Sequence, residues 1–225
     1  MCLASINATH LENNAHFVMN RKEDIVGIQE HKLTASGILD MVETFKTSGW
    51  SFMCGPVEQA SKRANAGVGI ASQKTRILKG DRTTQNSEKA YRLGRADKYY
   101  IDNGGDKDNI IIFIIYGKSG DTKHARGITE AIIAACREEI GPQCNQPVLI
   151  IGDFNAIPSS FNGTAELMEE GAWIDVGATA SWWGGFDNQS TCAQRAGARE
   201  TRIDGVWQIA WPSPILEDSK SRKTR

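Results

Sequence analysis

The chain has 225 residues, of which 40% are hydrophobic and 24% are charged, the composition of an ordinary soluble globular protein. Its 26 lysine and arginine residues nearly balance its 27 aspartate and glutamate residues, so the formal net charge is −1. That balance excludes a global positive field that would draw the whole chain to nucleic acid or to an anionic membrane. A polyanion would have to be bound by a local patch, although we interpret the basic clusters at 89–98, 195–202 and 220–225 as solvated surface.

The five cysteines are scattered and form neither a C-x-x-C pair nor a spacing typical of zinc ligands, so we expect free thiols in a reducing compartment. The N-terminal sequence MCLASINATH is not a signal peptide, because no basic region precedes an apolar core. The most apolar run, IIIFII (110–115), is far shorter than the about 20 residues that a membrane-spanning helix needs. We expect an intracellular protein, in the nucleus or the cytoplasm, that does not bind membranes.

Apolar runs and helical periodicity predict the secondary structure in chain order. Strands are expected at 2–7, 25–29 and 66–72, a hairpin at 99–102 and 109–117 around the turn NGGDKD, further strands at 148–151 and 202–209, and helices at 37–50, 125–141 and 164–170. No internal repeat or linker divides the chain, so residues 1–225 should form a single domain. The order lacks a regular β-α-β alternation, and neither a G-x-G-x-x-G nor a P-loop motif is present. It favours an α/β protein in which two sheets pack face to face with helices outside.

The stretch LIIGDFNAIPSS (149–160) places an acid and an amide directly after a run that should be buried. One interpretation is a simple turn, which Asp153 and Asn155 both favour. The other is a functional site. In an extended chain residues two apart point to the same side, so Asp153 and Asn155 would face one spot while Phe154 faces the core.

Three other predicted strands carry polar residues at comparable positions. Glu30 follows the second strand. Ser5 and Asn7 share one face of the first strand, and the last strand presents Arg202 and Asp204 in the same way. Buried polar groups cost free energy unless they are paired or bind a ligand. Acids and amides at sheet ends suit Mg²⁺, or Mn²⁺ in its place, because these hard cations take oxygen ligands.

Such a cluster supports displacement at a phosphate group. Glu30 would bind the metal, which polarises the phosphate. Asp153 would orient or deprotonate the attacking water, and Asn155 would donate a hydrogen bond to a phosphate oxygen.

Five short motifs occur in order between residues 5 and 204: Asn7 in the first strand, Gln29-Glu30 in IQEHKL, Tyr116 in IIYGKSG, Gly152-Asp153-Phe154-Asn155, and Thr201-Arg202-Ile203-Asp204. Together they resemble the endonuclease/exonuclease/phosphatase superfamily, the family of deoxyribonuclease I and exonuclease III. A lone G-D-F-N would be weak, but with I-Q-E upstream and R-I-D downstream it is a specific signal. In style the sequence is most similar to the nuclease domains beside reverse transcriptases in non-LTR retroelements.

The resemblance implies a four-layer α/β/β/α sandwich and an Mg²⁺-dependent phosphodiesterase. The implied enzyme is a DNA endonuclease that is a monomer and was once linked to a reverse transcriptase. Each matching residue has an implied role: Glu30 as metal ligand, Asp153 as the residue that aligns the nucleophilic water, Asn7 and Asn155 as amides lining the phosphate site, Tyr116 as a phosphate contact, and Asp204 as the acid that supports a catalytic histidine. After Tyr116, the usual family residues are replaced by GKS (117–119).

The chain departs from the family pattern at its C-terminal end. Family members end in S-D-H, whereas this chain stops 21 residues after Asp204, and its four histidines all precede Asp153. We therefore expect the C-terminal strand to be missing, a bare apolar edge at 202–209, a disordered basic tail at 217–225, and slow catalysis. The alternative function is a catalytically inactive, truncated derivative that acts as a binding module or is a gene fragment.

Six further residues each have two interpretations. Lys32 and Arg202 could contact phosphate, or Lys32 could be a surface lysine and Arg202 an ion-pair partner. Trp182 and Trp183 could be wedges between DNA bases or core residues, and His31 and His124 could be site histidines or surface-loop histidines. For the two histidines the surface interpretation is favoured.

Overall fold

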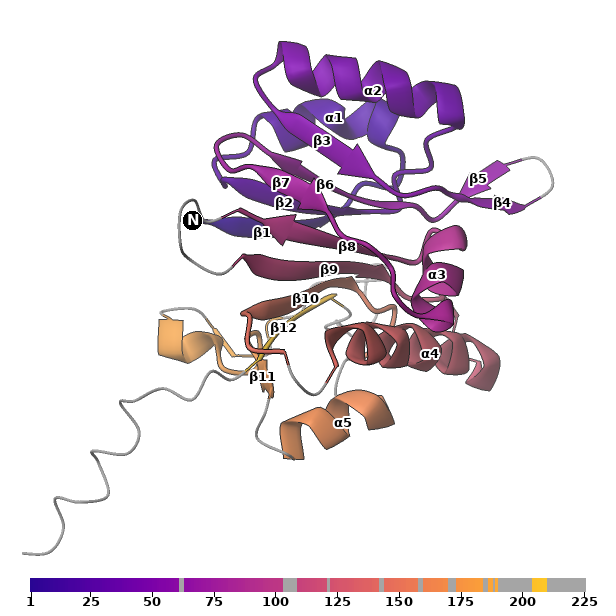
Figure 1. Cartoon of the computed structure of the whole chain (residues 1–225), viewed down its shortest axis with the longest axis vertical. Helices are drawn as coiled ribbons and strands as arrows, with labels where there is room; N and C mark the ends of the chain where they lie inside the picture. Colours follow the sequence, from indigo (N-terminus) through magenta and orange to yellow (C-terminus); the bar gives the residue numbers. More distant parts are fainter. Residues whose placement is uncertain are drawn as a thin grey trace, which may run out of the picture.

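The computed structural model describes residues 1–60, 63–102, 109–120, 122–141, 144–157, 160–169, 173–183, 186–187, 189 and 204–209. In this part of the chain two β-sheets stack face to face, and helices cover both outer faces (Figure 1). This order of helix, sheet, sheet and helix is the predicted four-layer α/β/β/α sandwich. Among the described residues, none of the helices has the length and apolarity needed to cross a membrane.

The first sheet has the strand order β1-β2-β6-β3. Its strands are β1 (Leu3–Asn7), β2 (Ile25–Gln29), β3 (Ser51–Cys54) and β6 (Val68–Ser72), and its outer face is covered by α1 (Leu11–Met19) and α2 (Ala35–Thr47). β1 and β2 run parallel, so their carboxyl ends lie side by side, whereas β6 is antiparallel to both of its neighbours. A short hairpin of β4 (Glu58–Ala60) and β5 (Arg63–Asn65) extends away from the sandwich (Figure 1).

The second sheet has the strand order β11-β12-β10-β9-β8-β7. Its strands are β7 (Ile77–Lys79), β8 (Ala96–Ile101), β9 (Ile110–Tyr116), β10 (Val148–Asp153), β11 (Trp173–Asp175) and β12 (Asp204–Ile209), and the accompanying helices are α3 (Gln85–Arg92), α4 (Lys123–Ile140), α5 (Asn162–Glu169) and the 3-10 helix η2 (Ala180–Trp183). β9 and β10 are parallel because α4 connects them as a crossover. That crossover brings the ends of β9 and β10 together.

Three apolar layers hold the four structural layers together. One lies between the first sheet and α1 and α2 and includes Phe45, one lies between the two sheets and includes Ile112, and one lies between the second sheet and α4 and includes Phe113. Alternate residues of β9 therefore face different layers, which explains why IIIFII is apolar without alternation. At Gly27 the two sheets approach so closely that an added Cβ atom would lie 2.6 Å from Ile151 Cδ1.

Each predicted strand and helix is present, β2 with the predicted bounds and the others with shifted bounds, and β8 and β9 form the predicted hairpin. The helices α1 and α3 and the short strands β3, β4, β5, β7 and β11 were not predicted, because they are short or have mixed composition. The expected bare edge is wrong, since β12 pairs with β10 on one side and with β11 on the other. Residues 210–225, with the tail predicted to be disordered, lie outside the described part of the chain.

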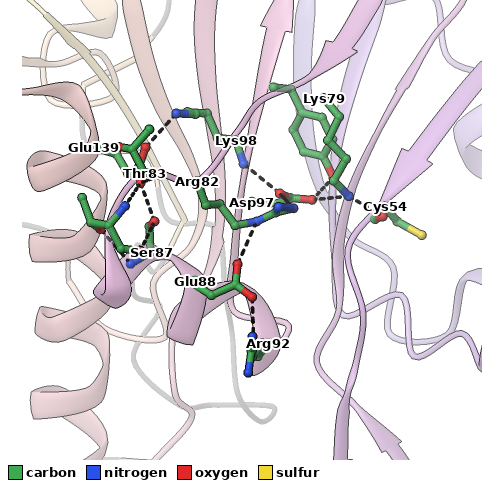
Figure 2. A network of polar contacts seen from close by, with 12 residues as sticks. Cys54, Lys79, Arg82, Thr83, Ser87, Glu88, Arg92, Asp97, Lys98 and Glu139 are labelled. Atoms are coloured by element: carbon green, nitrogen blue, oxygen red, sulfur yellow. Dashed lines mark hydrogen bonds and ion pairs between the residues drawn. The ribbon is translucent and has the colours of Figure 1, made fainter.

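A buried ion pair fastens α4 to the second sheet (Figure 2). Lys98 Nζ lies 2.7 Å from Glu139 Oε2, and the two side chains are 7% and 1% exposed, so Lys98 is not the solvated lysine that its basic cluster suggested. Glu139 also accepts hydrogen bonds from the backbone N–H groups of Thr83 and Thr84 and from the Ser87 hydroxyl. Burial raises the pKa of Glu139, but Lys98 and these donors outweigh it and lower the pKa to about 2.

We expect Glu139→Gln to lower the free energy of unfolding by about 3–5 kcal/mol at neutral pH, because Lys98 would remain buried without its counter-charge. The folded-state pKa lies below the ordinary value of 4.5, so this stabilisation is complete above about pH 4.5 and is lost as the pH falls towards 2. Urea titrations at a series of pH values measure the effect, with Glu138→Gln, which removes an exposed charge from the same helix, as the control. A destabilisation that stays constant down to about pH 2 would contradict this assignment.

Candidate active site

Strand ends from both sheets meet at one place. Asn7 is the last residue of β1 and Asp153 is the last residue of β10. Although these two residues are 146 positions apart in the sequence, Asn7 Nδ2 donates a 2.9 Å hydrogen bond to Asp153 Oδ2. In the register of the second sheet, Asp153 lies between Tyr116 of β9 and Asp204 of β12. β2, the parallel neighbour of β1, ends immediately before Glu30. The structure thus gathers five of the predicted site residues from five strand ends.

Asp153 ends its strand in a tight turn. Its Oδ1 accepts a 2.8 Å hydrogen bond from the Asn155 N–H group, and Asn155 has a left-handed φ of 54°. The Asn155 carboxamide then donates to the Gly117 carbonyl oxygen at 3.0 Å. Phe154 is 1% exposed and packs in the core as predicted, but the extended geometry predicted through Asn155 is wrong. The turn and the polar cluster, which the sequence presented as alternatives, are both present.

Negative charge accumulates around Asp153, which is 4% exposed. Burial, with a smaller contribution from the charges of Asp204 and Glu30, outweighs the hydrogen bonds from Asn7 and the Asn155 N–H group and raises the pKa of Asp153 to about 6. Burial also raises the pKa of Tyr116 to about 12, with further contributions from Glu30 and Asp153. The phenol is therefore protonated at neutral pH and can donate a hydrogen bond. A cation would stabilise this group of acids.

The segment after β2 has a strained backbone and a buried histidine. Glu30 and Lys32 have left-handed φ values of 57° and 52°, and Lys32 Nζ lies 2.7 Å from Glu30 Oε1, so Lys32 is a partner of the proposed metal ligand. Between them His31 is 1% exposed, and its Nδ1 accepts a hydrogen bond from the Leu33 N–H group. Burial lowers the pKa of His31 to about 4, so the surface interpretation is wrong for this histidine. His124 is exposed at the start of α4.

Of the three predicted substrate contacts Arg202, Trp182 and Trp183, only Trp182 has a described side chain. Arg202 lies outside the described residues, so its function as a phosphate contact stays a prediction. Trp182 is 70% exposed, so its interpretation as core is wrong. The side chain of Trp183 also lies outside what the structure describes, and a wedge function for either tryptophan stays a prediction.

Arg95 is a site neighbour that the sequence analysis missed, because it was grouped with solvated basic residues. It is 5% exposed and donates a 3.0 Å hydrogen bond to the Gly117 carbonyl oxygen, the same atom that the Asn155 carboxamide contacts. The local sequence carried no clear signal for this burial, because β8, the strand that Arg95 precedes, itself contains the charged residues Asp97 and Lys98.

The donor set fits a hard divalent cation. Glu30, Asp153 and Asp204 offer carboxylate oxygens in a region of excess negative charge. Among the described residues no group of three or more histidine, cysteine, aspartate or glutamate side chains is placed to hold a metal ion. Mg²⁺ is commonly held by one or two carboxylates, with waters and substrate phosphate as its other ligands, so this arrangement suits it.

Comparison with solved structures identifies the fold. The chain is similar to a 3'-5' exonuclease from Neisseria meningitidis, with a TM-score of 0.62 and 14% identity over 93% of this chain and 87% of that one. It is also similar to an AP endonuclease from Archaeoglobus fulgidus (TM-score 0.62, 16% identity, 93% and 86% covered) and to a mannosyl-6-phosphatase from Bacteroides thetaiotaomicron (TM-score 0.62, 15% identity, 95% and 86% covered). No protein-family model and no curated protein matches the sequence. The chain has the fold of the endonuclease/exonuclease/phosphatase superfamily, as its motifs predicted.

We expect Asp153→Asn to leave the metal-free fold at least as stable as the wild type at neutral pH, because it removes a buried charge beside other acids. The folded protein binds the Asp153 proton more tightly than the unfolded chain does. The stability of the wild type relative to Asp153→Asn should therefore fall by about 3 kcal/mol as the pH rises from about 4 to about 6.

Thermal unfolding in the presence of a chelator, at a series of pH values, measures this difference. Asp40→Asn, which changes an exposed acid on α2, is the control. A difference that does not vary over this pH range would show that Asp153 titrates like an exposed carboxyl group.

Proposed function

We propose that the chain is a metal-dependent phosphodiesterase that hydrolyses the phosphodiester backbone of DNA. The observation that carries this proposal is the hydrogen bond from Asn7 to Asp153, which joins strand ends of two different sheets. Besides the acid and the amide that it joins, the site contains the Asn155 amide, the Tyr116 phenol and the Glu30 carboxylate. These are the groups that displacement at a phosphate requires.

Asp153 would align the attacking water and accept its proton. With a pKa of about 6 it is a carboxylate at neutral pH, yet it is close enough to the working pH to take up a proton in the transition state. Asn7 holds one carboxylate oxygen and the Asn155 N–H group holds the other. The orientation of the base is therefore set before a substrate binds, which lowers the entropic cost of reaction.

Asn7, Asn155 and Tyr116 would donate hydrogen bonds to phosphate oxygens. Each carboxamide has two N–H groups and uses one of them in the described contacts, Asn7 toward Asp153 and Asn155 toward Gly117. The protonated phenol of Tyr116 can donate where negative charge grows on the phosphate in the transition state.

Glu30 would hold the metal, Mg²⁺ or Mn²⁺, through its carboxylate. When bound, the ion supplies positive charge to the phosphate and to the surrounding acids. Lys32, which pairs with Glu30 in the structure, could then turn to a substrate phosphate. Asp204, the register neighbour of Asp153, adds a further carboxylate to the same cluster.

DNA is the proposed substrate because the motifs resemble those of nucleases and because two similar solved proteins are titled exonuclease and AP endonuclease. Another is titled mannosyl-6-phosphatase, so a phosphomonoester is the competing substrate class. Action as a monomer, a former link to a reverse transcriptase and slow turnover stay predictions from the sequence.

We expect Glu30→Gln to lose most of the Mg²⁺ binding that calorimetric titration measures on the wild type, because an amide lacks the charge that holds the ion. Glu30→Gln and Asp153→Ala should each cleave DNA at least about 100-fold more slowly. Glu43→Gln changes an exposed acid on α2 and should match the wild type in both assays.

Equal Mg²⁺ affinity of the wild type and Glu30→Gln would contradict the metal assignment. Hydrolysis of p-nitrophenyl phosphate, without hydrolysis of DNA or of bis(p-nitrophenyl) phosphate, would indicate a phosphomonoesterase. Binding of DNA without cleavage in Mg²⁺ or Mn²⁺ would support the alternative of an inactive binding module.

A further inference from the structure

We propose that Arg95 is a positioning residue of this site, which holds Tyr116 and Asn155 in place through the tyrosine ring and the Gly117 carbonyl group. The inference rests on the proposed function of the site. Arg95 immediately precedes β8, and its side chain is only 6% exposed. Burying a guanidinium costs free energy, so its position is set by the contacts that compensate this cost.

The Gly117 carbonyl oxygen joins Arg95 to Asn155. Arg95 Nη1 and Asn155 Nδ2 each donate to this oxygen at 3.0 Å. The Gly117 N–H group in turn donates to the backbone carbonyl of Asp153 at 2.7 Å. The direction of the Asn155 carboxamide therefore depends on a carbonyl group that Arg95 holds from its other side.

A second contact joins Arg95 to Tyr116. The guanidinium carbon lies 4.8 Å from the centre of the tyrosine ring, within the range of a cation–π interaction. The Tyr116 N–H group also donates to the Arg95 carbonyl oxygen at 2.8 Å. Arg95 thus contacts both the ring and the backbone of Tyr116, which fixes the place of the phenol.

Glu58 holds the other end of the guanidinium. Arg95 Nη2 donates to Glu58 Oε2 at 3.1 Å, and Glu58 is the first residue of β4, in the hairpin that extends from the sandwich (Figure 1). A guanidinium can bond to Gly117 and Glu58 at once because its donors are fixed in a planar fork. A lysine ammonium group at this position would keep the charge but could not reproduce the fork.

Arg82 offers a matched control. Its guanidinium carbon lies 3.3 Å from the centre of the Tyr91 ring, and its Nη2 lies 3.5 Å from Asp97 Oδ1, so it too pairs with a tyrosine and an acid. Arg82 belongs to the polar network of Figure 2, and its described contacts are with Tyr91, Asp97 and Glu88, none of which is a proposed site residue.

The test compares Arg95→Lys, Glu58→Gln and Arg82→Lys in the full chain. We expect Arg95→Lys to lower kcat about 100-fold while KM changes less than about threefold, because misplacing a catalytic group by about 1 Å has a cost of this order. Glu58→Gln should lower kcat in the same direction but less. Arg82→Lys should lower thermal stability and leave kcat within about twofold of the wild type.

Nuclear magnetic resonance of the metal-free protein gives a readout that needs no turnover. The side-chain amide signals of Asn155 and the ring signals of Tyr116 can be assigned with Asn155→Asp and Tyr116→Phe. These signals should shift in Arg95→Lys and stay in place in Arg82→Lys.

Unchanged kcat in Arg95→Lys, or unchanged signals of Asn155 and Tyr116, would overturn the proposal and leave Arg95 as a structural residue. If the wild type hydrolyses no phosphate ester, the proposed function fails by itself. The two sets of signals would then decide separately whether Arg95 positions Asn155 and Tyr116.

Discussion

The hydrogen bond from Asn7 to Asp153 is the contact on which the site depends, because it joins the ends of two strands that belong to different sheets. The distance of 2.9 Å can be kept only if the sheets pack at one offset. The apolar layer between them sets that offset, and at Gly27 an added Cβ atom would lie 2.6 Å from Ile151 Cδ1. The core between the sheets therefore determines the site geometry as well as the stability.

Two buried acids of the second sheet have opposite surroundings. The Asp97 side chain is 0% exposed and is compensated by Lys79 Nζ at 2.9 Å, by Arg82 Nη2 at 3.5 Å and by the Tyr99 hydroxyl at 2.8 Å. Asp153 receives its described hydrogen bonds from neutral N–H groups, and the nearby charges that act on it are acidic. The first arrangement stabilises the fold. The second retains excess negative charge, as is typical of sites that bind a cation or move a proton.

Backbone strain is concentrated near the same place. Among the described residues, the left-handed non-glycine positions include Glu30, Lys32 and Asn155 of the site. At Gly152 an added Cβ atom would lie 1.9 Å from the Ile115 carbonyl oxygen, so no other residue fits before Asp153. Such conformations cost free energy and persist only where the surrounding structure enforces them. Besides Thr9 and Ala66, the left-handed non-glycine residues of the described chain are the acid Glu30, its ion-pair partner Lys32 and the amide Asn155.

The sequence alone determined the layers and the chemical groups of the site. Apolar periodicity is a local property, and it predicted the longer strands, including the one that contains IIIFII, the long helices, and the strand ends that carry Glu30 and Asp153. Only the tertiary structure decided that Asn7 reaches Asp153 and that Arg95 contacts the Tyr116 ring. The burial of His31 and the two neighbours of β12 were likewise decided there. These contacts join segments far apart in the chain, and they depend on how two sheets pack against each other, which no local pattern specifies.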